Sequence, residues 1–182
     1  MVPKAVEFVK AFIDEGKLVN GGLMPTSSAA DGTGKVSGVR VDLLSEQNGC
    51  RTYVLAFHPD DEAVAGLNEF VREHRISCAH FTAIGALSRA TLAWYDVPRK
   101  TCREIRVDEP VDVVSCIGDV ALDQDDSPIV HVHCAVSDRT GKVTGGHLPD
   151  GPVSATLEVF LTEEPTPIRK VLDDRLGLKL IE

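Results

Sequence analysis

Three of the six histidines lie close together in the segment from Ile129 to Leu148. His131 and His133 alternate with valines, a pattern typical of a β-strand, so the two side chains share one face with Cα atoms about 6.6 Å apart. His147 follows after a turn sequence, Asp-Arg-Thr-Gly. Neutral imidazoles that converge on one point bind divalent metal ions, above all Zn²⁺ at roughly 2.0–2.1 Å, and three of them leave a fourth position open for water or a ligand.

The side of the sheet on which His147 lies depends on the loop before it. A three-residue loop at Arg139–Gly141, with its glycine in the left-handed conformation, pairs Asp138 with Lys142 and puts His147 directly opposite His133. A loop of two or four residues would send His147 to the other face. The first register brings three imidazoles together.

Gly145 and Gly146 stand directly before His147. They fit either a β-bulge or a clearing for a ligand. The alternative to a metal site is that the histidines are ordinary polar residues on a half-buried sheet face, which is the better interpretation of a lone His-x-His. A third histidine at a register-compatible spacing favours the metal site.

The elements that position these residues are predominantly strands. One substantial helix is predicted from Pro59 to His74, with acidic residues at its start and an apolar stripe along it. Ile168–Leu176 is predicted to add a last helical turn or two. Strands with one segregated helix indicate an α+β domain, mostly antiparallel, with the helix covering one face. The predicted strands are 39–44, 51–57, 78–87, 90–96, 101–107, 111–122, 129–137, 142–146 and 153–162.

Residues 1–50 are predicted to form an extension, and residues 51–182 the domain itself. Within the extension, Pro3–Glu15 has the apolar spacing of a short amphipathic helix followed by Gly16. Asn20–Gly38 is rich in glycine, serine and threonine and indicates a loop or mobile linker. Gly32-Thr-Gly-Lys35 lacks the leading glycine and the final Ser or Thr of a phosphate loop.

The composition narrows the class of protein. With 182 residues and 43% apolar residues the chain suits one globular domain, and it contains no run of 18 apolar residues that could cross a membrane. The N-terminus does not read as a signal peptide, because Glu7 and Lys10 interrupt its apolar stretch. Five scattered cysteines without a Cys-x-x-Cys indicate reduced thiols and a cytoplasmic protein. Cys134 points away from the face of His133, so packing is its expected role.

The net charge of −9 bears on nucleic acid as a partner. A DNA-binding protein needs cations along the phosphate track, and a net negative charge makes non-specific affinity weak unless a local basic patch overrides it. The densest basic cluster is Arg99, Lys100, Arg103 and Arg106. Its better interpretation is a solvated strand edge.

Val-His-Val-His at 130–133 followed by Gly-Gly-His-Leu at 145–148 resembles the signature of the plants and prokaryotes conserved (PPC) domain family. The segments 70–76, 83–87, 109–118 and 155–159 fit the same family, so the resemblance extends from about Arg51 to the C-terminus. It implies an α+β fold, a homotrimer, and a metal site made by the three histidines in bacterial and archaeal members. Such members are commonly regarded as DNA-binding, and plant relatives carry an AT-hook. This chain has no Arg-Gly-Arg-Pro hook, and Asp112 replaces a glutamate of many relatives.

Together these observations predict a cytoplasmic homotrimer in which His131, His133 and His147 bind a divalent metal, in the first place zinc, for a regulatory or ligand-binding role. The alternative is a metal-dependent enzyme that uses the open site on a small molecule. It would need a general acid or base, for which Asp112 and Glu158 are weak candidates, because carboxylates on strands are more often solvated or salt-bridged. DNA binding rests on the resemblance alone, and the net charge disfavours it.

Overall fold

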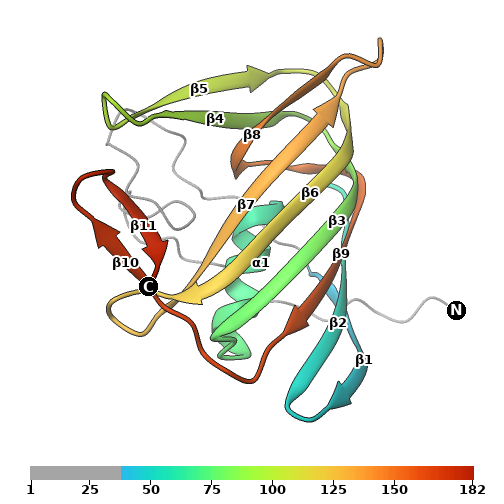
Figure 1. Cartoon of the computed structure of the whole chain (residues 1–182). Helices are drawn as coiled ribbons and strands as arrows, with labels where there is room; N and C mark the ends of the chain where they lie inside the picture. The colour runs from blue at the N-terminus through green and yellow to red at the C-terminus, as the bar shows by residue number, and fades with distance from the viewer. Residues whose placement is uncertain (1–37) are drawn as a thin grey trace, which may run out of the picture.

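The computed structural model describes residues 38–182, so the predicted helix Pro3–Glu15 and nearly all of the predicted linker lie outside the described residues. Nine strands form one sheet in the order β1-β2-β9-β3-β6-β7-β8-β4-β5, and every pair of neighbours is antiparallel (Figure 1). Together with one helix this is the predicted α+β architecture. The sheet comprises β1 (Arg40–Gln47), β2 (Cys50–Phe57), β3 (Cys78–Leu87), β4 (Ala90–Asp96), β5 (Thr101–Val107), β6 (Val111–Leu122), β7 (Pro128–Ser137), β8 (Val143–Asp150) and β9 (Val153–Glu163).

Helix α1 (Ala63–Glu73) lies in the hollow of the curved sheet and contacts β7 and β8 (Figure 1). Its apolar side chains are buried, as the stripe predicted. The helix begins later than predicted, because Glu62 is its N-cap and the acidic residues before it form the preceding turn. One acid, Glu62, therefore caps the helix, and none occupies its first turn.

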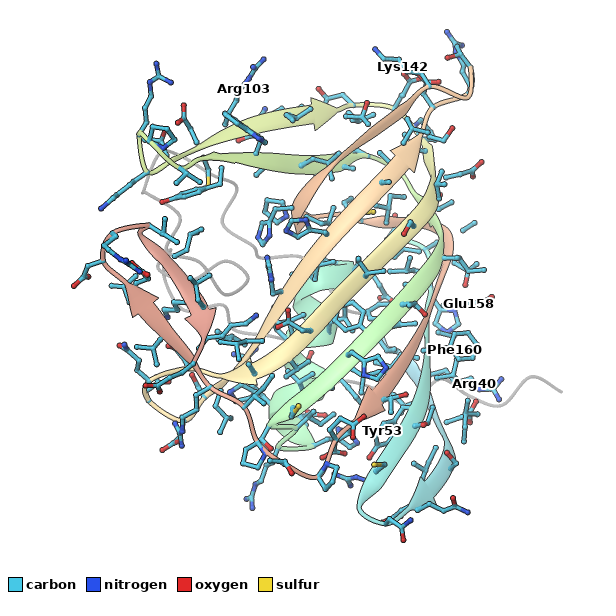
Figure 2. The ribbon with its side chains drawn as sticks, viewed as in Figure 1. Arg40, Tyr53, Arg103, Lys142, Glu158 and Phe160 are labelled. Carbon is cyan, nitrogen blue, oxygen red and sulfur yellow. The ribbon has the colours of Figure 1, made fainter. Side chains whose placement is uncertain are left out.

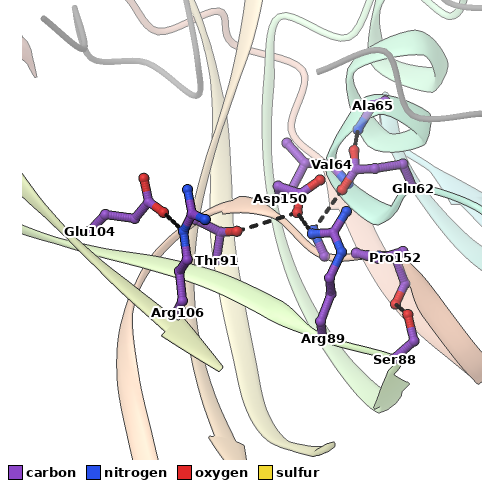
Figure 3. A network of polar contacts seen from close by, with 11 residues as sticks. Glu62, Val64, Ala65, Ser88, Arg89, Thr91, Glu104, Arg106, Asp150 and Pro152 are labelled. Atoms are coloured by element: carbon purple, nitrogen blue, oxygen red, sulfur yellow. Dashed lines mark hydrogen bonds and ion pairs between the residues drawn. The ribbon is translucent and has the colours of Figure 1, made fainter. Parts of the chain in front are cut away.

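The buried carboxylate of Glu62 ties the start of α1 to the segment after β8. It accepts hydrogen bonds from the backbone N–H groups of Val64 at 3.3 Å, Ala65 at 2.5 Å and Gly151 at 2.8 Å (Figure 3). These donors satisfy both oxygens, and the carboxylate in turn supplies an acceptor for N–H groups that a helix start leaves free. A second polar contact closes the same region, where Arg89 pairs with Asp150.

The core lies between α1 and the inner face of the sheet. Cys116 on β6 lies directly opposite Cys134 on β7, and both side chains are buried in this core. The hydrogen bond with the neighbouring Cys134 thiol, together with burial, raises the pKa of Cys116. Cys134 thus has the packing role predicted for it, and all five cysteines of the chain are free thiols.

The end of the described chain differs from the prediction. In place of a helical turn at Ile168–Leu176, β10 (Lys170–Asp173) and β11 (Leu178–Ile181) form a separate two-stranded hairpin. Its turn is closed by Gly177 in a left-handed conformation at φ +69°, with its N–H donating to the Asp173 carbonyl at 2.7 Å. A Gly-closed turn between two short runs rich in apolar residues is a hairpin signal, and it outweighed the helical pattern.

Ion pairs hold this C-terminal hairpin against the rest of the domain. Lys170 pairs with Asp119 of β6, and Lys179 pairs with Asp123 just after β6; both lysine side chains are nearly buried. At the opposite side the Tyr95 hydroxyl donates to the carbonyl of Leu176 at 2.7 Å. The hairpin therefore bridges the β6–β7 connection and β4, as its place in Figure 1 shows.

The outer face of the sheet carries exposed apolar side chains. Thr82 of β3 lies opposite Phe160 of β9 on one side and opposite Ile117 of β6 on the other, and Ile117 lies opposite His133 of β7. These residues therefore share one face. Phe160 and Ile117 are 49% and 55% exposed, and Phe160 points outward beside Glu158 in Figure 2. Among residues 38–182, no helix is long and apolar enough to span a bilayer.

Candidate metal site

The β7–β8 hairpin has the register predicted for a three-residue loop. His133 lies directly opposite His147, the N–H of Asp138 donates to the carbonyl of Lys142 at 3.0 Å, and Gly141 has φ +82°. Strand β8 continues to Asp150, beyond the predicted end at 146, so His147 lies within the strand. The loop sequence thus sets which face carries the third histidine.

Three imidazoles converge as a result of this register. Ring centroids are 4.9 Å apart for His131 and His133, 5.1 Å for His131 and His147, and 5.7 Å for His133 and His147. One potential ligand atom of each residue lies within 4.8 Å of the others. Nitrogens that share a tetrahedral zinc ion are about 3.3 Å apart, a value that follows from Zn–N bonds of roughly 2.0–2.1 Å. Small side-chain rotations would close that gap, so the residues fit a metal ion.

The surroundings of the cluster favour uncharged imidazoles. Burial lowers the pKa of His147 to about 3, and the nearby His131, His133 and Lys170 add to the effect. Burial also lowers the pKa of His133, with His131 contributing. A metal ion binds neutral imidazole, so a site that resists protonation remains available to a metal at mildly acidic pH.

The two glycines before His147 have different neighbours. A Cβ on Gly146 would lie 2.6 Å from the carbonyl oxygen of Ala93, which belongs to β4. Close approach of another strand therefore explains Gly146, rather than the ligand clearance considered from the sequence. A Cβ on Gly145 would lie 3.2 Å from the carbonyl oxygen of Cys134, a tight contact but not a forbidding one.

Asp119 is a neighbour of the cluster that the sequence analysis did not identify. It lies opposite His131 in the β6–β7 ladder, and its Oδ2 is 3.5 Å from the Nδ1 of His131. Its other oxygen pairs with Lys170. Burial acts to raise the pKa of Asp119, but the hydrogen bonds with His131 and Lys170 outweigh it and lower the pKa. The signal was present, because a five-residue turn at 123–127 fixes Asp119 opposite His131.

The two carboxylates considered as general acids or bases lie elsewhere. Asp112 is exposed on β6 opposite Ser137, at the far end of β7 from His131. Glu158 is exposed on β9, which is separated from β7 by β3 and β6. At roughly 4.8 Å per strand this spacing alone places Glu158 about 14 Å from β7. Neither residue belongs to the histidine cluster.

Two of the four residues of the basic cluster pair with acids near them. Arg99 pairs with Asp96, and Arg106 pairs with Glu104. Arg103 lies on the same hairpin, β4–β5, at the top of Figure 2. An arginine paired with an acid contributes less to a phosphate track than an unpaired one.

Comparison with known proteins places the chain in a family. The family profile of the Plants and Prokaryotes Conserved domain (PCC, also written PPC) matches residues 44–165, about two thirds of the chain. The chain belongs to the PPC family. The match begins within β1, whose pairing with β2 extends the sheet into the segment before residue 51, and it ends before the C-terminal hairpin.

Solved PPC-like structures share the fold. A plant- and prokaryote-conserved protein of Pyrococcus horikoshii is 29% identical with a TM-score of 0.67, covering 72% of this chain and 91% of that one. A metal-containing protein of Archaeoglobus fulgidus is 27% identical with a TM-score of 0.66, covering 78% and 96%. A candidate DNA-binding protein of Ralstonia eutropha is 26% identical with a TM-score of 0.65, covering 71% and 90%.

A curated relative matches part of this chain within a much longer chain. The bifunctional protein GlmU of a Synechococcus strain is 29% identical over 115 residues. That alignment spans 62% of this chain but only 17% of the relative. The likeness therefore concerns one part of that protein.

Proposed function

We propose that this PPC protein binds a divalent metal ion, in the first place zinc, through His131, His133 and His147, and that the metal serves a regulatory or ligand-binding role. The observation that carries the proposal is the convergence of one ligand atom from each histidine within 4.8 Å. The low pKa values of His133 and His147 support it, because both favour the neutral form that metals bind. The metal content of the Archaeoglobus relative is a further argument.

A bound zinc ion would supply a Lewis-acidic position for an oxygen or nitrogen donor of a ligand. His133 is exposed in the single chain, so this position would open onto the outer face of the sheet rather than into the core. Catalysis would also require a proton donor or acceptor close by. Asp112 and Glu158 lie away from the cluster, and Asp119 already pairs with Lys170. The arrangement therefore favours ligand binding over the alternative of an enzyme acting on a small molecule.

The test is the metal content of protein purified without a histidine tag. Wild type should contain one zinc per chain by plasma mass spectrometry, and His131→Ala/His133→Ala should contain none. His58→Ala is the matched control, because His58 is exposed in the turn before α1 and far from the cluster in sequence; it should retain the metal. Equal metal content in wild type and the double variant would refute the proposal, as would metal-free wild type that takes up no added zinc.

We further propose that the chain self-associates as a homotrimer through the outer face of its sheet. The exposed apolar side chains of Ile84, Ile117 and Phe160 support this, because such side chains on neighbouring strands gain most from burial against a partner. A trimer should have a mass near 59 kDa, three times the 19.6 kDa of one chain. Light scattering coupled to size exclusion measures it, and a 19.6 kDa particle at micromolar concentration would exclude the trimer.

DNA binding is the weaker candidate, supported by the description of the Ralstonia relative. A net charge of −9 and the pairing of Arg99 and Arg106 with nearby acids argue against it. Binding through phosphates would weaken steeply as salt rises. Fluorescence anisotropy with duplex DNA at 25 mM salt should therefore detect no complex at micromolar protein, and a salt-sensitive complex would restore this candidate.

A further inference from the structure

A carboxylate on the strand next to β7 contacts one of the three histidines of the proposed metal site. Asp119 and His131 are register partners on β6 and β7, and the Oδ2 of Asp119 lies 3.5 Å from the Nδ1 of His131, at the outer limit of a hydrogen bond. A neutral imidazole carries its proton on one nitrogen and offers a lone pair on the other. The nitrogen that faces the carboxylate is therefore the one that carries the proton.

Lys170 fixes the orientation of that carboxylate. Its ammonium pairs with Oδ1 of Asp119, which leaves Oδ2 for His131. The lysine side chain is only 5% exposed, whereas that of Asp119 is 34% exposed. A nearly buried cation needs a close anionic partner, so the carboxylate has little freedom to turn away. Lys170 belongs to the C-terminal hairpin, which lies beyond the residues matched by the family profile.

We propose that Asp119 is a positioning residue for the metal site: it accepts the hydrogen bond of the His131 Nδ1–H, so that Nε2 of His131 is the metal-binding nitrogen, and Lys170 holds the carboxylate in place. This role rests on the proposed function. Carboxylates that orient a metal-binding histidine also make the imidazole a better donor, and their loss typically lowers metal affinity 10–100-fold. The C-terminal hairpin thereby contributes to a site whose ligands all come from β7 and β8.

Two measurements test the role. Long-range ¹H–¹⁵N spectra of the imidazoles report which nitrogen of His131 is protonated, in the metal-free and in the zinc-loaded protein. Competition with a chromophoric chelator gives the zinc dissociation constant. Wild-type His131 should be protonated on Nδ1 in both states, and D119A should lose this preference and bind zinc 10–100-fold more weakly. D119N should recover part of both, because its amide oxygen still accepts a hydrogen bond.

Variants of the lysines separate positioning from general stabilisation. K170M should also weaken zinc binding and give a mixture of His131 tautomers, because it releases the carboxylate. K179M is the matched control, since Lys179 is a similarly buried lysine of the same hairpin whose ion pair, with Asp123, does not involve Asp119; it should match wild type in both measurements. If D119A does not fold because Lys170 is left buried without an anionic partner, the double variant D119A/K170M is measured instead.

The outcomes are distinguishable. Wild type that binds zinc, with D119A unchanged in tautomer and affinity, would overturn the role of Asp119 and leave the proposed function intact. K170M identical to wild type would overturn the role of Lys170. Equal losses in K179M and D119A would reduce the effect to hairpin stability and overturn the positioning role. Wild type that binds no zinc would overturn the proposed function and this role with it.

Discussion

Replacement of the buried Glu62 should lower the free energy of unfolding of this domain. Its carboxylate is buried and receives three backbone N–H groups, from Val64, Ala65 and Gly151. Glu62→Ala leaves all three donors without this acceptor, at roughly 1–3 kcal/mol each when no water replaces it. Removing the carboxylate also ends the cost of burying it, a cost visible in its pKa, which burial raises. Because these effects oppose one another, we expect a net loss of about 3–4 kcal/mol.

The size of this loss can be checked by urea unfolding followed by circular dichroism, with chelator present so that bound metal does not add stability. With a slope near 2 kcal/mol per molar, a loss of that size lowers the midpoint by about 1.5–2 M. Glu62→Gln keeps the oxygen that faces Val64 and Gly151 but sets an N–H against that of Ala65, so about half the loss is expected. Glu73→Ala, on the exposed end of α1, is the control and should change stability by less than about 0.5 kcal/mol.

A free energy of unfolding of Glu62→Ala within about 1 kcal/mol of wild type, at an unchanged slope, would contradict the prediction. Water would then satisfy the three donors, and the carboxylate would have no special place in the fold. A Glu62→Gln variant that is more stable than wild type would contradict the prediction as well. That result would mean that the desolvation of the carboxylate outweighs its hydrogen bonds.

Three further predictions concern the site and the sheet. The free energy of unfolding of the metal-free protein should fall as pH drops below 6.5, by roughly 2 kcal/mol at pH 5, because His147 takes up a proton more readily in the unfolded chain than in the folded one, where its pKa is about 3. His147→Gln should lose this part of the pH dependence. Urea midpoints that change in parallel with pH for both proteins would contradict the prediction. Gly146→Ala should cost about 1–3 kcal/mol in thermal denaturation because its Cβ would meet a carbonyl 2.6 Å away, whereas Gly145→Ala should stay within about 1 kcal/mol; equal effects would show that β4 yields freely. If the chain forms the proposed homotrimer, Phe160→Asp should convert it to a 19.6 kDa particle, and an unchanged trimer mass would place the interface on another face.

Local sequence was sufficient for much of the fold and for the histidine cluster. The turn Asp138–Lys142 has few conformations that suit its glycine, and this fixed the register that places His147 opposite His133. Strands such as β3, β4, β5 and β6 have the predicted bounds because alternation of apolar and polar residues is a local property. Whether three imidazoles hold a metal remains a prediction.

What the sequence did not provide depends on contacts between distant segments. The C-terminal hairpin forms where a helical turn was expected. Its two lysines pair with acids in the rest of the domain, and its turn accepts a hydrogen bond from Tyr95 of β4, so its partners lie 51 to 81 residues away. Asp119 could have been located from the 123–127 turn, but its pairing with Lys170 could not, since that contact exists only once the hairpin has docked. Carboxylates such as Glu158 were considered for chemistry because a sequence gives residue types without the strand order that separates them.

The opposed thiols of β6 and β7 allow the rate at which this part of the sheet opens to be measured. Cys116 and Cys134 are sealed in the core directly behind the strands that carry Asp119 and two of the histidines, whereas Cys50 and Cys102 are only half-buried. Cys78 is a fifth thiol, buried on β3 outside this pair. With Cys78 replaced by serine, a thiol reagent meets two populations: thiols that react through small fluctuations, and a pair that reacts only when the two strands part. The slow phase of labelling measures the rate at which the scaffold of the histidine site comes apart, with no probe added to the chain.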